Sequence, residues 1–172
     1  CSSDKTIRIW DLVTGKCERV CVGHRDEVLC ICKCDDRRIL LSGGKDASLK
    51  FWNIQKGTCM HTIPNAHTSA IVCIEYSSTQ NVIVTASSDQ TIKLWTINPL
   101  LIEQGNCLER VRILKNPFAE PFTIVKLNPS NEKQLWSGDA KGNILLWDMK
   151  TTTIINQIVN AHNDEITSFV LH

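Results

Sequence analysis

The chain has 172 residues, enough for one domain with a hydrophobic core, and its 42% hydrophobic and 22% charged residues are ordinary for a folded protein. The formal net charge of +1 gives no basic field, which argues against nucleic acid or an anionic membrane as a partner. No apolar run reaches the roughly 18 residues that span a bilayer, and no charged-then-apolar leader stands at the front.

Segments in which apolar and polar residues alternate with period two recur along the chain and predict short β-strands. Ile92 and Leu94, for example, face one side of their predicted strand. The stretch 38–52 predicts two strands around a tight turn supplied by Gly43 and Gly44. In chain order, the expected strands are 6–10, 27–34, the two within 38–52, 58–63, 70–76, 91–95 and 165–172. No segment has a helical period, so about four short strands are expected per ~40 residues.

One phrase of about ten residues is written four times. It reads SSDKTIRIWD at 2–11 and returns at 43–53, 87–96 and 139–148. The tryptophans that close it are Trp10, Trp52, Trp95 and Trp147, at intervals of 42, 43 and 52 residues. Two further markers keep the same register: the histidines His24, His67 and His162, and three Gly-x-Cys motifs. This period, together with the strand count, is typical of the blades of a β-propeller.

These motifs resemble the WD-repeat (β-transducin-like) β-propeller family, and the resemblance covers the whole chain. It implies an all-β fold of four-stranded antiparallel blades, with three full blades and a partial blade at each end. We expect residues 1–172 to form one propeller segment whose repeat cores end near Trp10, Trp52, Trp95 and Trp147. Because the chain starts with Cys1 rather than Met, we expect a fragment of a larger, seven-bladed type of propeller.

In this family, a His, a Ser or Thr, an Asp and a Trp of each blade form a hydrogen-bonded set. The resemblance places one set at His24, Ser42, Asp46 and Trp52, and a second at His67, Thr85, Asp89 and Trp95. Asp4 and Trp10 have no histidine before them, while His162 has no Asp and Trp after it. Either His162 joins Asp4 and Trp10 across a closed four-blade ring, or all three belong to a larger propeller.

The third full unit departs from the pattern. Lys141 stands where the Asp is expected, Phe118 stands where the His is expected, and Asp139 lies two positions too early. Because the expected His and Asp are absent together, neither is left buried without its hydrogen-bond partner. We therefore predict that apolar packing holds this blade, with Phe118, Phe122 and Trp136 as candidates. The same unit carries an insertion at 98–106 and a loop with two prolines at 115–122.

Two chemical interpretations compete with the structural one. His24, Ser42 and Asp46 contain the members of a catalytic triad, but a set that recurs with the fold's period favours a structural bond over a single active site. Cys30, Cys32 and Cys34 could suggest a metal site, although zinc sites favour cysteine pairs on turns. We expect no catalytic residue, no metal and no cofactor.

Nine cysteines would suggest disulfides in a small secreted protein, but that context is missing here. The one N-x-S/T triplet, at 128–130, is excluded as a glycosylation site by its proline. We therefore expect reduced thiols and a cytoplasmic or nuclear location.

The resemblance implies a non-catalytic scaffold that binds other proteins or peptides. The alternative is a substrate-docking or regulatory part of a multidomain enzyme, such as a ubiquitin ligase or a motor protein. Nucleic acid, membrane and small-molecule partners are not expected. The candidate partner-binding positions follow the three histidines: Arg25, Asp26 and Glu27; Thr68 and Ser69; and Asn163, Asp164 and Glu165. The acids among them predict a weak preference for a basic peptide.

Overall fold

The structure is a computed structural model that describes residues 1–34, 38–98, 101–102, 107–168 and 170. In that part of the chain, the regular elements are β-strands. They are β1 (Thr6–Trp10), β2 (Cys17–Val22), β3 (Val28–Cys34), β4 (Ile39–Gly44), β5 (Leu49–Asn53), β6 (Thr58–Ile63), β7 (Ile71–Ser77), β8 (Val82–Ser87), β9 (Thr91–Ile97), β10 (Leu108–Lys115), β11 (Phe122–Leu127), β12 (Gln134–Asp139), β13 (Ile144–Asp148) and β14 (Thr153–Ile158).

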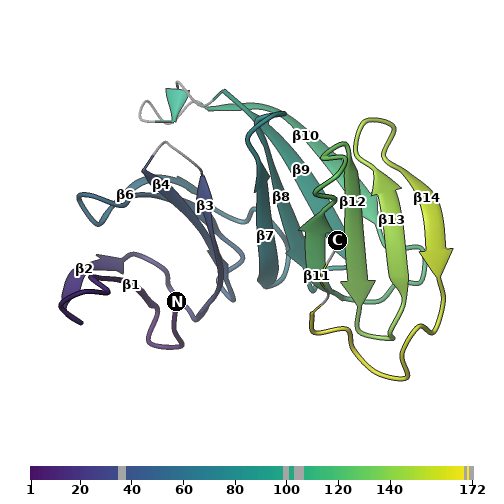
Figure 1. Cartoon of the computed structure of the whole chain (residues 1–172), viewed down its shortest axis with the longest axis horizontal. Coiled ribbons are helices and arrows are strands. Elements are labelled where there is room, and N and C mark those ends of the chain that lie inside the picture. Colours follow the sequence, from purple (N-terminus) through teal and green to yellow (C-terminus); the bar gives the residue numbers. More distant parts are fainter. Residues whose placement is uncertain (35–37, 99–100, 103–106, 169, 171–172) are drawn as a thin grey trace.

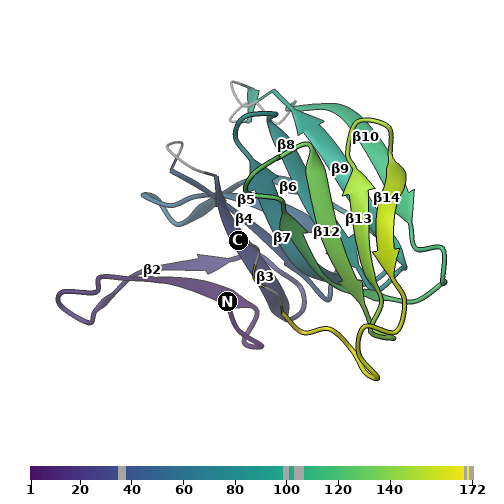
Figure 2. The same cartoon turned by 45° about the vertical axis from the view of Figure 1, so that its right-hand side comes forward.

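The strands form one two-stranded and three four-stranded antiparallel sheets, each a simple meander. We call them blade A (β1 and β2), blade B (β3 to β6), blade C (β7 to β10) and blade D (β11 to β14). Figure 1 shows the blades side by side in chain order, with blade A at one end of the row and blade D at the other; Figure 2 gives a second view. The four-blade ring is therefore not formed, and that alternative is wrong because the end blades do not meet.

The repeated phrase forms the turn that leads into the third strand of blades B, C and D and into β1 of blade A. One residue of this turn, five positions before the tryptophan, has a positive φ in every blade: Lys5 (68°), Ala47 (56°), Gln90 (69°) and Gly142 (79°). In blades A, B and C the preceding aspartate accepts the backbone N–H two residues further on, as in Thr91 N to Asp89 Oδ1 (3.0 Å). A short acidic side chain that bonds its own backbone stabilises such a turn.

The hairpin within 38–52 differs from its prediction. Gly43 and Gly44 lie inside β4, and the turn is made by Lys45 to Ser48 instead. The glycines serve close packing: a Cβ on Gly44 would lie 2.2 Å from the backbone oxygen of Glu27.

The segment 165–172 was expected to be a strand, but its described residues 165–168 and 170 pair with no strand. Ile166 packs against Gly138 of β12 instead, and the Thr123 hydroxyl donates to the backbone oxygen of Ile166 (2.5 Å). Without a neighbouring second strand, these residues have no ladder to complete.

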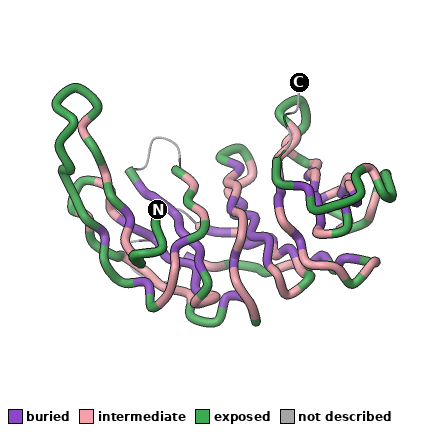
Figure 3. The backbone as a smooth tube through the Cα atoms, turned by 90° about the horizontal axis from the view of Figure 1, so that it is seen from below, coloured by how far each residue is buried: buried purple, intermediate pink, exposed green. Residues whose placement is uncertain are grey.

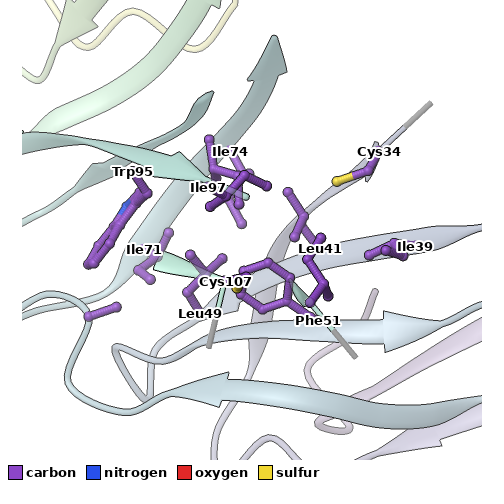
Figure 4. Packing of buried hydrophobic residues seen from close by; sticks show 13 residues of the cluster. Cys34, Ile39, Leu41, Leu49, Phe51, Ile71, Ile74, Trp95, Ile97 and Cys107 are labelled. Carbon is purple, nitrogen blue, oxygen red and sulfur yellow. The ribbon is translucent and has the colours of Figure 1, made fainter. Parts of the chain in front are cut away.

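The hydrophobic core lies between neighbouring blades. Because side chains alternate along a strand, the middle strands of a blade bury apolar residues on both faces. The largest cluster joins blades B and C, where Leu49 and Phe51 of β5 lie close to Ile71 of β7 (Figure 4). Every residue of β4 and of β8 is buried, whereas β2 and β14 are largely exposed. Figure 3 shows this gradient, with buried segments in the middle of the row and exposed loops at its margins.

Candidate functional site

Blade B carries the first polar set in its interior. His24 lies before β3, and its Nδ1 is 2.9 Å from Asp46 Oδ2 while its Nε2 is 2.6 Å from Ser42 Oγ. The indole Nε1 of Trp52 donates to the same hydroxyl at 2.7 Å. The side chain of His24 and the whole of Ser42 have no exposed surface. The chain of bonds therefore ties the segment before β3 to β4, β5 and their turn.

Blade C repeats this arrangement with a threonine in place of the serine. His67 Nδ1 lies 2.9 Å from Asp89 Oδ2, and its Nε2 lies 2.7 Å from Thr85 Oγ1. Trp95 Nε1 donates to Thr85 Oγ1 at 2.9 Å. A hydroxyl that is buried and already engaged by an imidazole and an indole offers no access to a substrate, so both sets have the geometry of a structural bond.

The electrostatics of both sets favour a neutral histidine beside an ionised aspartate. Burial lowers the pKa of His67, and the nearby carboxylate of Asp89 only partly opposes this. Burial disfavours the charge of Asp89, but hydrogen bonds from Thr91, Thr68 and His67 outweigh it and hold the pKa of this carboxyl at about 2. The pKa of His24 and that of Asp46 are lowered in the same way.

Blade D replaces the histidine with amides, which corrects the prediction that apolar packing alone holds it. Asp139 is 1% exposed and accepts from Asn116 Nδ2 (3.0 Å) and Asn143 Nδ2 (2.9 Å). Trp147 Nε1 still donates to Ser137 Oγ at 2.8 Å. The carboxylate reaches the turn from two positions earlier because it lies at the end of β12, and amide donors take the place of the imidazole.

The aromatic candidates of blade D behave differently from one another. Phe122 is buried, 6.4 Å between ring centroids from Trp147, and Phe118 packs partly buried against the cluster between blades C and D. Trp136 was expected to pack between sheets, but it is only half-buried. Its neighbour Leu135 belongs to the cluster between blades C and D, so by strand alternation Trp136 lies on the other face of blade D.

Asn116 and Asn143 complete the bonds of blade D and were not predicted from the sequence. Asn116 lies next to a proline in the 115–122 loop, and Asn143 lies in the turn of the repeated phrase. The available signal was Ser137, which keeps its position ten residues before Trp147, together with an acid near the turn. A carboxylate buried there requires hydrogen-bond donors.

The residues at the two ends of the chain are not brought together. Asp4 Oδ1 accepts from the backbone N–H and the hydroxyl of Thr6, at 3.0 and 2.6 Å. Trp10 is 51% exposed. His162 is exposed, and its backbone N–H donates to the oxygen of Gly142.

Two cysteines of the inner strands form hydrogen bonds between neighbouring blades. Cys30 Sγ on β3 donates to the Ile71 oxygen on β7 (3.4 Å), and Cys73 Sγ on β7 donates to the Val125 oxygen on β11 (3.5 Å). Burial raises the pKa of both thiols. Among the described residues, no group of three or more His, Cys, Asp or Glu side chains could hold a metal ion.

The candidate partner-binding residues lie where the inner strands β3 and β7, and the segment after His162, begin. In the first loop, the backbone N–H of Arg25 donates to Asp46 Oδ2 (2.8 Å), Asp26 accepts the Glu27 N–H, and Glu27 pairs with Lys45 (2.8 Å).

The other two loops are held by similar local bonds. Thr68 donates its N–H to Asp89 Oδ2 (3.0 Å), and the Ser69 oxygen accepts from Ser87 Oγ (3.3 Å). Asn163 is exposed, and Asp164 accepts the Glu165 N–H (2.8 Å). These bonds fix the loop backbones at the edge of the blades while leaving side chains such as Asn163 toward solvent.

An open groove of about 500 Å³ lies at the same edge, between blades C and D. Its walls include Val72 near the start of β7 and Pro121, Phe122 and Thr123 at the start of β11. Glu165 supplies a carboxylate at the groove. The surface therefore combines an apolar wall with one acid, which suits a peptide side chain better than a small charged molecule.

Four-stranded antiparallel blades stacked face to face, each with a buried polar set, define a segment of a β-propeller. The family model for "WD domain, G-beta repeat" matches residues 15–53 and 57–96, which contain the two complete His–Ser/Thr–Asp–Trp sets. These two segments are therefore WD repeats, and the four-stranded blades agree with this assignment. In the part that the structure describes, no helix is long and apolar enough to cross a membrane.

The curated relatives carry diverse names. Nuclear distribution protein PAC1-2 of Uncinocarpus reesii is 42% identical over 62 residues, or 36% of this chain and 14% of that protein. A CCR4-associated factor 4 homolog of Candida glabrata is 27% identical over 96% of this chain and 31% of its own length. Mitochondrial division protein 1 of Eremothecium gossypii is 27% identical over 96% of this chain and 25% of its own. The chain thus spans less than a third of the length of each.

Proposed function

We propose that this chain is a non-catalytic scaffold that binds other proteins or peptides at the edge where its inner strands begin. WD40 repeats generally mediate binding to other proteins. The observation that carries the proposal is the groove between blades C and D, whose lining includes Val72 near the start of β7 and Glu165 after His162.

The chemistry of the polar sets supports a scaffold. The imidazoles, hydroxyls and carboxylates that could do catalytic work in blades B and C are buried and bonded to one another. Each set holds its loop in place, so the edge is a rigid platform. A preorganised surface loses little conformational entropy on binding, which favours recognition of short segments.

The partner is proposed to be an extended segment with a basic side chain. Glu165 lines the groove, and Asp26 and Asp164 lie at the same edge of the fold. The names of the relatives, among them a nuclear distribution protein and a CCR4-associated factor, support an intracellular place of action. The formal charge of +1 gives no support to nucleic acid binding.

Site-directed photo-crosslinking tests the proposed surface. A photoreactive amino acid is placed at Thr68 in the full-length protein, and in a matched variant at Lys56, in the turn between β5 and β6 at the opposite edge. We expect adducts with the same cellular proteins from Thr68 in repeated experiments and none of these from Lys56. Equal adducts from both positions would contradict the proposed edge.

Charge reversal tests the preference for a basic segment. Glu165→Lys should weaken binding of a protein captured through Thr68, because it removes the acid from the groove and adds a cation. Glu109→Lys on the outer strand β10 is the control, since Glu109 is exposed and far from the groove in the sheet. Unchanged affinity for Glu165→Lys would remove the proposed charge preference.

A further inference from the structure

A second, smaller pocket lies in blade B, on the face that is turned toward blade A. Its volume is about 100 Å³. Lys50 of β5 and Thr62 of β6 form one side, and Arg25 in the loop after His24 forms another. The pocket is therefore separate from the groove between blades C and D.

Lys50 is buried with little to neutralise it. It is only 9% exposed, and among the described residues its single hydrogen bond goes to the hydroxyl of Thr62, 3.0 Å from Nζ. An ammonium group has three N–H donors, and burying a charge costs free energy unless it is paired. The site thus holds a cation with donors to spare.

The one acid that lines the pocket is already saturated. Asp46 accepts from His24 Nδ1 and the Arg25 N–H at one oxygen, and from the N–H and hydroxyl of Ser48 at the other. The guanidinium of Arg25 has no acceptor among the described residues. Two cations therefore face the pocket against a single carboxylate that is bonded elsewhere.

The equivalent lysine of blade C makes different contacts. Lys93 donates to the backbone oxygen of Ala66 at 2.6 Å and lies 5.7 Å from the centroid of the Trp95 ring. Its partner on the outer strand is Ile113, whereas the partner of Lys50 is Thr62. Lys50 therefore donates to a side-chain hydroxyl at the pocket, whereas Lys93 donates to a backbone carbonyl.

We propose that this pocket binds one anionic oxygen group, a carboxylate or a phosphate, between Lys50 and Arg25. Ammonium and guanidinium groups form their strongest hydrogen bonds with such anions. The group is supplied by an acidic or phosphorylated side chain of the bound peptide, a step that rests on the proposed function. Binding of the anion itself does not depend on it.

The test is a titration of the full-length protein, labelled with fluorotryptophan, with inorganic phosphate and separately with acetate at constant ionic strength. Trp52 shares the strand face of Lys50 and reports on the pocket, while Trp95 is the matched reference. We expect a saturable shift of the Trp52 signal and none at Trp95. A tighter response to phosphate than to acetate identifies a phosphorylated ligand, and the reverse identifies a carboxylate.

Matched variants separate charge from folding. Lys50→Met should weaken binding about tenfold or more, because a hydrogen bond to a charged group is lost. Lys50→Arg should restore binding, and Lys93→Met should leave it unchanged. Unaltered binding by Lys50→Met, a shift that never saturates, or an equal shift at Trp95 would each overturn the proposal. Because free phosphate is the probe, failure of the crosslinking experiment leaves this result unaffected.

Discussion

In the blade interiors, a single residue determines whether a buried polar group keeps its hydrogen-bond partner. Asp46 and Asp89 each accept an imidazole N–H, a backbone N–H from the loop and bonds from their own turn. A buried group that loses its partner carries the full cost of its desolvation, which exceeds the gain of an ordinary hydrogen bond. Each polar set therefore stabilises its blade only while every member keeps its hydrogen-bond partner.

Blade D gives the sharpest test at this scale. Asp139→Ala should destabilise the protein by about 1–3 kcal/mol, because the amides of Asn116 and Asn143 lose their acceptor in the interior. Asp89→Ala should cost a similar amount through the orphaned His67. Urea unfolding measures both. Lys141→Ala, six positions before Trp147, is the control and should stay within about 0.5 kcal/mol. A loss at Lys141 equal to that at Asp139 would contradict the assignment.

The stability should also depend on pH in two stages. Burial lowers the pKa values of His24 and His67 in the folded protein. Near and below pH 6.5 the unfolded chain therefore binds more protons than the folded protein does. The free energy of unfolding is highest above about pH 6.5 and falls as the pH drops below it. The pKa of Asp89 is about 2, so its contribution is lost between about pH 3.8 and 2. Unfolding at pH 7.5, 5.5 and 3 measures both stages. His67→Asn should flatten the first, and His162→Ala should not alter it.

At the scale of elements, the spacing between blades depends on small side chains in the second strand. Gly43 on β4 faces Ile71 on β7, and a Cβ placed on it would lie 2.5 Å from Cγ2 of that isoleucine. Gly138 on β12 stands in the same relation to Ile166, at 2.9 Å. Gly43, which the sequence pattern placed in a turn, is in fact a contact point between two sheets, because the strand has no room for a methyl group beside Ile71.

Gly43→Ala should therefore destabilise the protein by about 1–3 kcal/mol through overpacking against β7. The melting temperature measures this loss, and hydrogen exchange should show faster opening of β4 and β7. Lys56→Ala, in an exposed turn of the same blade, should change stability by less than about 0.5 kcal/mol. A neutral Gly43→Ala variant would show that the blades separate easily to admit the methyl group.

For the molecule as a whole, side chains from neighbouring blades tie the row of sheets together. Glu132, between β11 and β12, accepts from the hydroxyl of Thr79 at 2.6 Å and from Ser77 in blade C. Lys126 and Glu75 pair across the same two blades on the inner strands. Hydrogen bonds from Ser77 and Thr79 lower the pKa of Glu132, so the tie is strongest above the acid range.

Removing this tie should loosen one interface and leave the others. Glu132→Ala should cost about 1 kcal/mol, the usual value of a hydrogen bond, and should speed amide exchange in the turns that join β7 to β8 and β11 to β12. Exchange in blade B should not change. Glu109→Ala, exposed on β10, is the control. Faster exchange throughout the chain would mean that Glu132 supports the fold globally rather than this interface.

The repeat register predicted the strand pattern, which rests on short-range alternation, and the resemblance to WD repeats predicted the two complete polar sets by residue. The expected strand at 58–63 coincides with β6, and 27–34 differs from β3 by one residue. The insertion expected at 98–106 lies mostly outside the described residues. The bonds of blade D were missed because Asn116 and Asn143 are not members of the repeated His–Ser/Thr–Asp–Trp set, and no local pattern marks their contact with Asp139.

By itself, the sequence determined the period and the blade architecture, because strand alternation and turn chemistry act over a few neighbouring positions. The resemblance to WD repeats added the identity of the bonded residues in blades B and C. Only the tertiary structure decided which contacts form between strands, loops and neighbouring blades. It placed Gly43 against Ile71 and gave Asp139 its amide partners. It also left Lys50 in a pocket, while Lys93 donates to the backbone oxygen of Ala66. The two lysines occupy the same register, and the contacts that distinguish them come from neighbouring strands and loops that the repeat pattern does not specify.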